Sequence, residues 1–300
     1  MKFEYIFANR SDYTVKKMAA VLEVSESGYH AWYKRIRLRI VSRRKRENDE
    51  LKDKILKIYW ESNGVYGHRK ITKKLRNNGV IADRKRVKHI MDTAGLRSIV
   101  RNKYKATTNS KHNYPVAPNI LNRQFYASRP NQKLVSDITY IWTDEGWLYL
   151  AAILDLCGRR IVGTAMSSRM TKDLVIDALQ DAVGRIGQKN CKDCILHSDR
   201  GSQYCSTRYQ NLLKSYGFVC SMSRKGNCWD NSPMECFWGK LKMEWLNTKR
   251  FKTRDEARAA VFEYIWIFYN RKRIHASNDY ETPDEYYYNR VNQKSDSLAA

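Results

Sequence analysis

The apolar residues between positions 51 and 94 recur every three or four residues, and this spacing predicts short amphipathic helices. Three stretches carry the pattern: LKDKILKIYWES, GHRKITKKLRNN and RKRVKHIMDTA. Gly79 follows the second stretch and Gly95 the third, where helices commonly end on glycine, and Asp83 is a suitable N-cap for the third. The pattern therefore predicts a small all-helical domain.

From residue 132 onward the pattern changes to short runs of β-branched and aromatic residues. QKLVSDITYIWT, WLYLAAILDL and RRIVGTAM predict three antiparallel strands, because the turn sequences DEG and CGR separate them. A helix from about Lys172 to Arg185, the apolar run CILHS, a helix at TRYQNLLKSYG and the run FVCSM follow in that order. This order predicts an α/β fold, a mixed sheet with flanking helices.

These changes of pattern divide the chain into five parts. A stretch that holds three of the five prolines among Asn, Ser and Thr predicts a linker. We expect a basic N-terminal helical arm at residues 1–46, the helical domain at 47–103, the linker at 104–130, the α/β core with its C-terminal helices at 131–290, and a tail at 291–300.

The net charge points to a polyanionic partner. The chain carries 56 Lys and Arg against 31 Asp and Glu, a net charge of +25. Nucleic acid is the leading candidate, with an anionic membrane surface or ribosomal RNA as alternatives. The stretch YKRIRLRIVSRRKR, at the end of the arm, predicts either DNA contact or a solvated helix face. Without a signal-peptide pattern or a long apolar run, we expect a cytoplasmic protein.

Two of the predicted helices, joined by the short GVIA turn, are similar to a helix-turn-helix motif. In that motif the start of the second helix faces the major groove of DNA. A three-helix packing unit with a basic exterior is an equally open alternative. The candidate DNA contacts in this domain are basic residues on both helices: Arg69, Lys70, Lys73, Arg84, Lys85 and Arg86.

Three acidic residues occupy positions that need an explanation in so basic a chain. Asp137 stands inside a predicted strand, where Asp is disfavoured. Asp199 follows the fourth predicted strand, at the end where open α/β sheets bind ligands. Glu235 begins a predicted helix in DNSPMECFWGKLKMEW. If the first and fourth strands lie side by side, the three carboxylates can converge.

Each acid also has an ordinary explanation. Asp199 suits a turn, and Asp137 suits an edge strand that must avoid aggregation. Glu235 suits a capping box with Ser232 as N-cap and Pro233 at the first helical position. We favour convergence, because phosphoryl transfer by two Mg²⁺ ions needs several carboxylates and hard cations prefer carboxylate oxygens. The Lys and Arg excess would attract the DNA.

The sequences around these acids resemble a known signature. SDITYIW, HSDRGSQYCS and DNSPMECFWGKLKMEW, with 35 residues between Asp199 and Glu235, resemble the DD(35)E signature of retroviral integrases and bacterial insertion-sequence transposases. YGHRKITKKLRNNGVIADRKRVKHIMDTAGLRS resembles the helix-turn-helix segment of second-frame (OrfB-type) transposases of the IS-three family. FYNRKRIHASNDYETPDEYY resembles that family's closing motif, and the matching residues are Tyr269, Asn270, Arg273, His275, Tyr280 and Pro283.

The resemblance, which covers about residues 12 to 290, implies a ribonuclease-H-like core. It implies that Asp137, Asp199 and Glu235 are the catalytic residues and the ligands of two Mg²⁺ or Mn²⁺ ions. The implied activity is metal-dependent cleavage of DNA 3′ ends and strand transfer of an insertion sequence. Water and then a DNA hydroxyl would be the nucleophiles, so no covalent protein intermediate is needed.

The resemblance also implies partners. They are the element ends, the target DNA and a second copy of the chain on DNA, in the cytoplasm of a bacterium at its nucleoid. Members of the family usually act with a first-frame product that has a leucine zipper, or fused to it. Since this chain shows no sustained heptad pattern, we expect it to be the catalytic half.

Further residues near the motifs are expected to support the site. Lys242 lies seven positions after Glu235 on one helical face and suits DNA contact, with a solvated lysine as the alternative. Further candidate DNA contacts are Lys225, Asn227, Arg273 and His275, of which the last two suit a structural role equally. Candidates for orienting DNA or the metal ligands, with packing as the alternative, are His197, Ser198, Gln203, Tyr204 and Asp230.

Two rival functions remain open at this point. A ribonuclease-H-like nuclease that only hydrolyses would use the same metals, but the basic helical domain disfavours it. A transposase-derived DNA-binding repressor would not need the acids, and all three are intact here.

Overall fold

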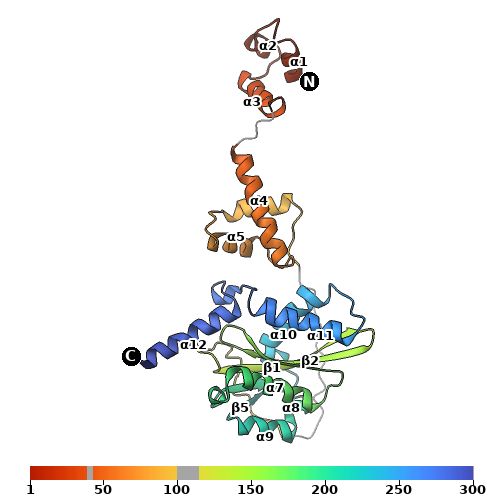
Figure 1. Ribbon diagram of the computed structural model, residues 1–300, viewed down its shortest axis with the longest axis vertical. Coiled ribbons are helices and arrows are strands. Elements are labelled where there is room, and N and C mark those ends of the chain that lie inside the picture. Colours follow the sequence, from red (N-terminus) through yellow and green to blue (C-terminus); the bar gives the residue numbers. More distant parts are fainter. Residues whose placement is uncertain (39–42, 100–114, 300) are drawn as a thin grey trace. The chain divides into compact units, whose positions relative to one another are not determined.

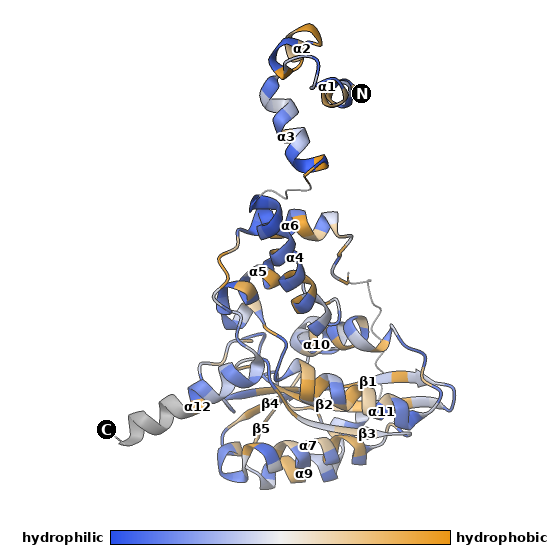
Figure 2. Ribbon diagram, turned by 45° about the horizontal axis from the view of Figure 1, so that its top comes forward, coloured by the Kyte–Doolittle hydropathy of each residue, from blue (hydrophilic) through white to orange (hydrophobic). Residues whose placement is uncertain are grey.

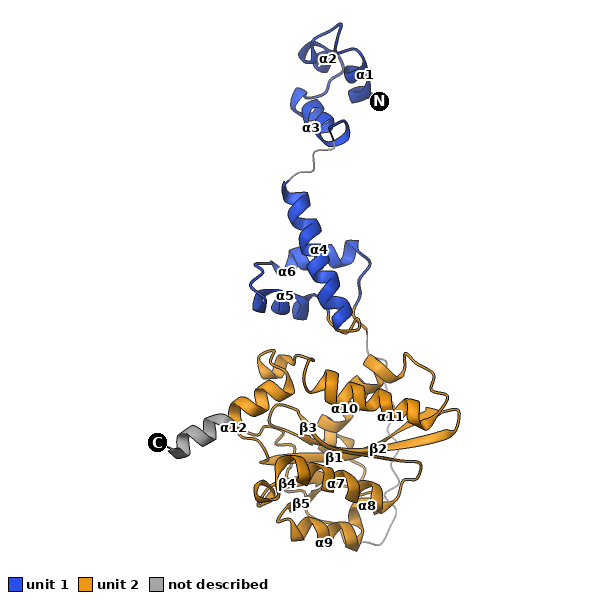
Figure 3. Cartoon of the chain, viewed as in Figure 1, with its two compact units in different colours: residues 1–61, 67–97 blue, residues 62–66, 98–300 orange. Residues whose placement is uncertain are grey.

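The computed structural model of the chain describes residues 1–38, 43–99 and 115–299, with side chains up to residue 291. It divides into two compact units (Figure 3). Unit 1 comprises Met1–Glu61 and Gly67–Arg97, and unit 2 comprises Ser62–Tyr66 and Ser98–Ala300.

The first part of unit 1 is a cluster of three short helices. They are α1 (Lys2–Ala8), α2 (Val15–Val21) and α3 (Glu26–Ile36), packed around Ile6, Met18, Ala19 and Tyr29. The predicted arm is therefore a small folded element in its first 36 residues. Residues 39–42, in the middle of its basic stretch, lie outside the described residues.

The rest of unit 1 contains the three predicted helices. They are α4 (Arg43–Glu61), α5 (His68–Asn77) and α6 (Arg84–Thr93). The Asp83 carboxylate caps α6 by accepting from the backbone N–H groups of Lys85 at 2.7 Å and Arg86 at 3.2 Å, as its position before an amphipathic run predicts. Helix α4 runs through the boundary that the sequence suggests at residue 46.

Unit 2 is built on a mixed five-stranded sheet. Its strands are β1 (Lys133–Thr143), β2 (Gly146–Asp155), β3 (Ile161–Ser167), β4 (Ile195–Ser198) and β5 (Val219–Met222), in the order β3-β2-β1-β4-β5. The first three strands are antiparallel, and β4 and β5 run parallel to β1. The α/β prediction is confirmed, and the first and fourth strands are neighbours.

Helices cover both faces of this sheet (Figures 1 and 2). One core holds α7 (Lys172–Ile186), α8 (Ser202–Cys205) and α9 (Thr207–Ser215), while the other holds α10 (Ser232–Leu241) and α11 (Arg254–Phe262). The last helix, α12, spans Pro283–Ala299. Gly163 on β3 lets α7 pack closely, because a Cβ there would lie 2.6 Å from the Cβ of Ala182.

Shorter helical segments complete the unit. Helix α10 continues as a π-helix, η3 (Lys242–Leu246), and α11 continues as a π-helix, η4 (Glu263–Tyr269). Three 3-10 turns are η1 (Gln188–Cys191), η2 (Cys228–Asn231) and η5 (Ala276–Asn278). Across the described ranges, no helix is both long and apolar enough to span a membrane.

The described part of the predicted linker packs on the sheet unit. Leu121 and Ala127 are buried in the core, and the hydroxyl of Ser221 on β5 accepts from the backbone N–H groups of Ile120 and Leu121, both at 3.0 Å. The prolines of this stretch rule out regular ladders but not burial, so linker is the wrong description of residues 115–130. Residues 104–114 lie outside the described residues.

Candidate active site

Strand register places two of the three acids at the same level of the sheet. β1 and β4 run parallel, with Val135 paired to His197. Asp137 and Asp199 each lie two residues beyond these partners, at the carboxyl ends of the paired segments. β1 is the middle strand of the sheet, but among the described residues its pairing with β4 ends at Val135, so the edge-strand explanation for Asp137 is not contradicted.

Helix α10 brings the third acid to the same place. The indole N–H of Trp238, three residues after Glu235, donates to the Asp137 carboxylate at 2.9 Å. Just before the helix, the Asn231 side-chain amide donates to the backbone carbonyl of Ser136 at 3.0 Å. The helix is thus bonded to β1 on both sides of Glu235 along the sequence.

Of the structural explanations for Glu235 and Asp199, the structure contradicts the first and agrees with the second. The capping box proposed for Glu235 does not form, because Ser232 is already helical, Asn231 is the N-cap and no side chain caps the helix. The Asp199 carboxylate does hold a turn, since it accepts from the backbone N–H of Gly201 at 2.9 Å. This turn orients Asp199, and its side chain remains partly exposed.

The electrostatics of Asp137 reflect its neighbours. Its pKa is raised to about 8, first by desolvation and then by the negative charges of Asp199 and Glu235, against the lowering effect of the Trp238 hydrogen bond. The charged form of Asp137 is disfavoured by desolvation and by repulsion from the two other acids. A bound divalent cation would offset both effects. All three side chains are partly exposed, so a cation and a phosphate can reach them.

The acids are not gathered tightly enough to coordinate an ion as they stand. Within the residues that the structure describes, no group of three or more Asp, Glu, His or Cys side chains has an arrangement that could hold a metal. The neighbouring charges and the carboxylate donors fit a divalent cation, and binding would require the acids to move closer together.

Three of the supporting candidates next to the acids are buried in the sheet unit. His197 is fully buried between the hydroxyls of Ser221 at 2.8 Å and Ser223 at 3.1 Å, and burial lowers its pKa to about 4. The Ser198 hydroxyl donates to the backbone carbonyl of Asp199 at 3.0 Å. The buried Tyr204 hydroxyl bonds to Ser136, the neighbour of Asp137, at 2.9 Å. These placements suit support of the acids rather than DNA contact.

Asp230 organises the loop before α10. Its buried carboxylate accepts from the Arg224 guanidinium at 2.7 and 2.9 Å, from Arg123 at 2.7 Å and from Asn119 at 2.9 Å. The Arg224 hydrogen bonds, followed by the others, hold the pKa of Asp230 well below its usual range. The charged network fixes the loop that leads into the Glu235 helix.

The remaining candidates of unit 2 divide into accessible and buried residues. Lys225 is exposed, and Asn227 accepts from Arg123 at 2.9 Å. The half-buried Gln203 donates to the backbone carbonyl of Met170 at 3.1 Å. Lys242 is mostly buried, with its ammonium 4.7 Å from the ring centre of Tyr140.

Arg273 and His275 lie inside the protein. The Arg273 guanidinium binds both carboxylate oxygens of buried Glu244, at 2.5 and 2.7 Å, and a nitrogen of His275 lies 3.1 Å from it. The Tyr264 hydroxyl donates to the same Glu244 at 2.8 Å. This burial favours the structural role over DNA contact for both residues.

The basic residues of unit 1 are mostly accessible. Arg69, Arg84 and Lys85 are exposed, while Lys70 and Lys73 are half-buried. Arg86 is engaged within the unit, because its guanidinium donates to the side-chain oxygen of Asn48 at 2.8 Å. Arg84 and Lys85 at the start of α6 are therefore the better placed of the candidates for groove contact.

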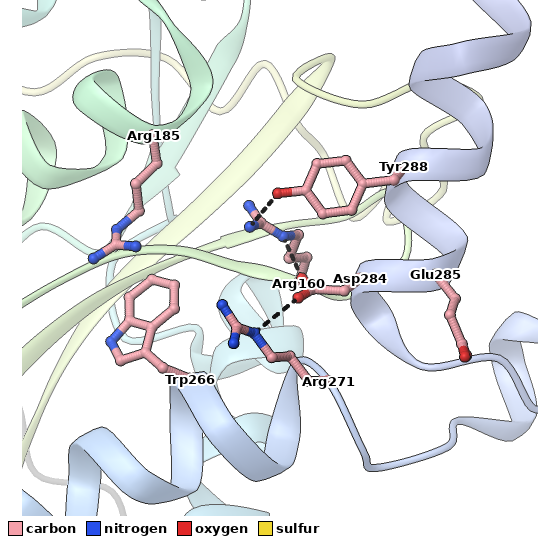
Figure 4. Close-up of a pocket in the computed structure, with 7 residues that line it drawn as sticks. All are labelled: Arg160, Arg185, Trp266, Arg271, Asp284, Glu285 and Tyr288. Carbon is pink, nitrogen blue, oxygen red and sulfur yellow. Dashed lines mark hydrogen bonds and ion pairs between the residues drawn. The ribbon is translucent and has the colours of Figure 1, made fainter.

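A pocket of about 540 Å³ elsewhere in unit 2 contains none of the candidate site residues. Its arginines are paired: Arg160 and Arg271 approach Asp284 at 2.6 and 3.8 Å, and Arg185 stacks on Trp266 with 3.7 Å to the ring centre (Figure 4). The two contacts to Asp284 join α12 to the rest of the unit, and the stacking joins α7 to η4.

Sequence reasoning missed Trp238, Asn231 and Glu244. Trp238 looks like a core residue of an amphipathic helix, and its spacing of three from Glu235 is the one signal that could have identified it. Glu244 has a signal too, since a carboxylate amid Trp and Leu needs a buried cationic partner.

Known family models match three segments of the chain. An integrase core domain matches residues 127–228, a second integrase core domain matches 235–290, and an HTH-like domain matches 38–104. The chain is 46% identical over 259 residues to the 31 kDa protein of insertion element IS600 from Shigella sonnei, covering 86% of this chain and 93% of that protein. It is 41% identical over 276 residues to transposase InsF of insertion sequence IS3A from Escherichia coli (strain K12), covering 92% and 94%.

Two of the solved structures with similarity come from viruses. One is the simian T-cell lymphotropic virus intasome in complex with the PP2A regulatory subunit B56 gamma, with 15% identity, a TM-score of 0.46, and coverage of 78% of this chain and 74% of that chain. Another is the HTLV-2 integrase catalytic core domain in complex with magnesium, in its trimeric form, with 17% identity, a TM-score of 0.43, and coverage of 54% and 99%.

Proposed function

Because the chain belongs to the IS3 family of insertion-sequence transposases, and is thus a DDE transposase, we propose that Asp137, Asp199 and Glu235 are its catalytic carboxylates. The observation that carries this assignment is the strand register, since Asp137 and Asp199 each lie two residues beyond the paired Val135 and His197 on neighbouring strands. The raised pKa of Asp137, whose causes include the charges of both other acids, agrees with it. The bond from Trp238 to Asp137 supports it, because it joins the helix of Glu235 to the strand of Asp137.

The three carboxylates would hold two Mg²⁺ or Mn²⁺ ions, since hard dications prefer carboxylate oxygens. When bound, such ions activate the attacking oxygen and stabilise the leaving oxygen in displacement at phosphorus. The chain itself contributes positioning: the Asp199 turn, the Trp238 donor and the Asp230 network each fix one part of the site. The Lys and Arg excess brings the polyanionic substrate to these acids.

The substrate is DNA, at the element ends and the target. Arg84 and Lys85 would enter the major groove from the start of α6, with Arg69, Lys70 and Lys73 on α5 binding phosphates. Exposed Lys225 and half-buried Asn227, beside the Asp230 network, would contact DNA near the acids. We expect the protein to act at the bacterial nucleoid, as a homo-oligomer.

The assignment is tested with Asp199→Asn and DNA that carries the inverted repeats flanking the coding region. With Mg²⁺, the parent should join 3′ ends to a target, and the variant should lose both cleavage and joining by at least about a hundredfold while its DNA affinity is unchanged or higher, since a negative charge is removed. The matched control is Asp193→Asn, an exposed aspartate elsewhere, which should retain full activity.

Other results would identify the rivals. A parent that cuts but never joins is a hydrolytic nuclease. A parent and Asp199→Asn variant that bind equally and show no metal-dependent cutting indicate a repressor.

We also propose that efficient end recognition requires a first-frame product, as partner or fusion. The chain lacks a sustained heptad pattern that could pair subunits through a zipper. In a gel-shift assay, the fused product should form paired-end complexes at a lower concentration than the isolated chain. Equal pairing by the two proteins would contradict this proposal.

A further inference from the structure

A second pocket, of about 350 Å³, is lined by residues of the β1–β2 hairpin and of the segment that follows α10. It combines exposed aromatic rings with cations, and the residues that matter are Tyr140, Trp142, Trp147, Lys242, Lys249 and Arg250. The catalytic assignment gives no role to the aromatic residues of this pocket.

The two tryptophans are exposed although they are large and apolar. Trp142 is 58% exposed and Trp147 42% exposed. They face each other across the hairpin as a paired position, with ring centres 4.8 Å apart and an edge-to-face geometry. Since neighbouring core positions such as Ile141 and Leu148 are buried, exposure of both indoles points to a ligand.

The hairpin that carries these rings is held in place. The backbone N–H of Asp144 donates to the carbonyl of Phe251 at 3.0 Å. The Arg254 guanidinium donates to the carbonyls of Glu145 at 2.6 Å and Trp147 at 3.1 Å. A held aromatic surface loses little conformational entropy when a flat ligand binds.

The cations around the rings favour an anionic ligand. Lys249 and Arg250 are both exposed, and the ammonium of Lys242 lies against Tyr140. Arg250 pairs with Asp144 at 3.2 Å, so its charge is partly compensated, while Lys249 lies over the Trp245 ring at 5.1 Å. Aromatic rings with neighbouring cations are the combination that binds single-stranded nucleic acid.

Two chain segments, β1 and the helix that carries Glu235, connect the pocket to the acids. Tyr140 lies three residues beyond Asp137, about 10 Å along a strand. Lys242 lies seven residues beyond Glu235, also about 10 Å along a helix. This distance corresponds to about three base-pair steps of duplex DNA.

A base must leave the duplex to reach the rings. Side chains alternate along β1, so Tyr140 and Trp142 face away from Asp137. Among the described residues, no strand pairs with β1 on the β4 side beyond Val135, and the Lys242 side chain reaches Tyr140 there. The edge of β1 beside the acids is therefore open, and stacking on both indoles needs the free face of an unpaired base.

We propose that this pocket binds an unpaired nucleobase of the DNA strand beside the scissile phosphate, stacked on Trp142 and Trp147, with Lys249 and Arg250 at the adjoining phosphates. The location rests on the proposed function of the acids. The stacking itself does not, because it requires neither cleavage nor metal.

The experiment uses the full chain with Asp199→Asn, so that DNA stays uncut, and no added metal. The probe is a duplex with three unpaired nucleotides at one 3′ end, one of them the fluorescent base 2-aminopurine, compared with the fully paired duplex. Stacking on tryptophan should quench 2-aminopurine. Trp142→Ala with Trp147→Ala should abolish this quenching and weaken binding of the frayed duplex about five- to hundredfold, with the paired duplex unaffected.

Two matched variants separate stacking from loss of folding. Trp142→Phe with Trp147→Phe keeps aromatic surfaces and should retain most of the frayed-duplex affinity. Phe262→Ala removes a comparably exposed ring, 53% exposed on α11, and should change neither affinity nor quenching.

Quenching and affinity that survive the double alanine change overturn the proposal. So does a double variant that loses self-association in sedimentation while binding both duplexes as the parent does, because the pocket is then a protein interface. Failure of the catalytic assignment is visible separately, as cleavage by the Asp199→Asn protein in Mg²⁺.

Discussion

Trp238 joins two functions in one side chain. Its ring packs in the core with Phe237, and its N–H donates to Asp137 at 2.9 Å. A hydrogen bond to a carboxylate favours the charged form and fixes its orientation. We therefore expect Trp238 to set the direction in which Asp137 presents its oxygens.

Trp238→Phe should lower the rate of strand transfer about 10- to 100-fold, because it removes the donor and keeps most of the ring. DNA affinity should not change. The matched control is Trp245→Phe, whose buried indole N–H has no hydrogen-bond partner in the described structure, so its loss should leave the rate unchanged. The rate is measured at saturating DNA and Mg²⁺; equal rates for the two variants would show that the Trp238 bond is not needed.

At this scale, sequence could identify the acids but not what holds them. Asp137 stands out because strands disfavour Asp, and the spacing from Asp199 to Glu235 is a signature. Asp230 was expected near the acids as an orienting residue, yet its partner Arg123 is 107 residues away. A long-range partner of that kind leaves no local pattern.

At the scale of elements, a buried ion pair links the π-helix η3 to the segment after η4. Glu244 lies in the π-helix η3, and a π-turn inserts an extra residue that changes the direction of the side chains after it. Glu244 thereby meets Arg273, with both side chains under 10% exposed. Burial of both charges makes each one dependent on the other.

Arg273→Met should lower the free energy of unfolding by about 3–5 kcal/mol, because it leaves the Glu244 charge buried and unpaired. Adding Glu244→Gln should restore part of the loss. Urea unfolding measures both. As a control, Arg208→Met breaks an exposed pair with Asp173 and should cost at most about 1 kcal/mol. A variant as stable as the parent but weaker on DNA would return Arg273 to the role of a DNA contact.

Sequence periodicity located the helices and strands, because burial of one face is a local pattern. It failed for segments whose order depends on distant contacts. Residues 115–130 read as a linker from their prolines, yet Ser221 on β5 fixes their backbone. The N-terminal residues were expected to form a helical arm, but their packed core was missed, because Ile6, Met18 and Tyr29 are few and far apart in the sequence.

The stability of the whole molecule should depend on pH through two acids whose pKa values are raised. The pKa of Asp137 is raised to about 8 and that of Asp155 to about 7, in both cases first by desolvation, from an ordinary value of 3.8. The folded protein therefore holds protons that the unfolded chain has released. Their stabilisation falls as pH rises above about 4 and is lost once pH passes the folded pKa.

Between pH 7 and 8.5 the metal-free protein should lose stability, and Asp137→Asn should remove most of that dependence. Asp155 is already half titrated at pH 7 and contributes less than Asp137 in this window, and neutral His197 does not contribute to it. Adding Mg²⁺ or Mn²⁺ at pH 8 should reverse the loss, because the ion replaces the proton. Urea unfolding with EDTA or metal measures this. The same slope in parent, Asp137→Asn and the control Asp193→Asn would contradict it.

The acids reach the site by two separable routes. Asp137 and Asp199 follow from the ladder of a sheet, whereas Glu235 arrives on a helix held by the side chains of Asn231 and Trp238. A mutation that displaces only that helix should leave a protein that folds and binds the inverted repeats but does not catalyse transposition. Such inactive proteins should compete with intact transposase for the same DNA ends. Loss of the contacts between this helix and β1 would then limit the spread of the whole element.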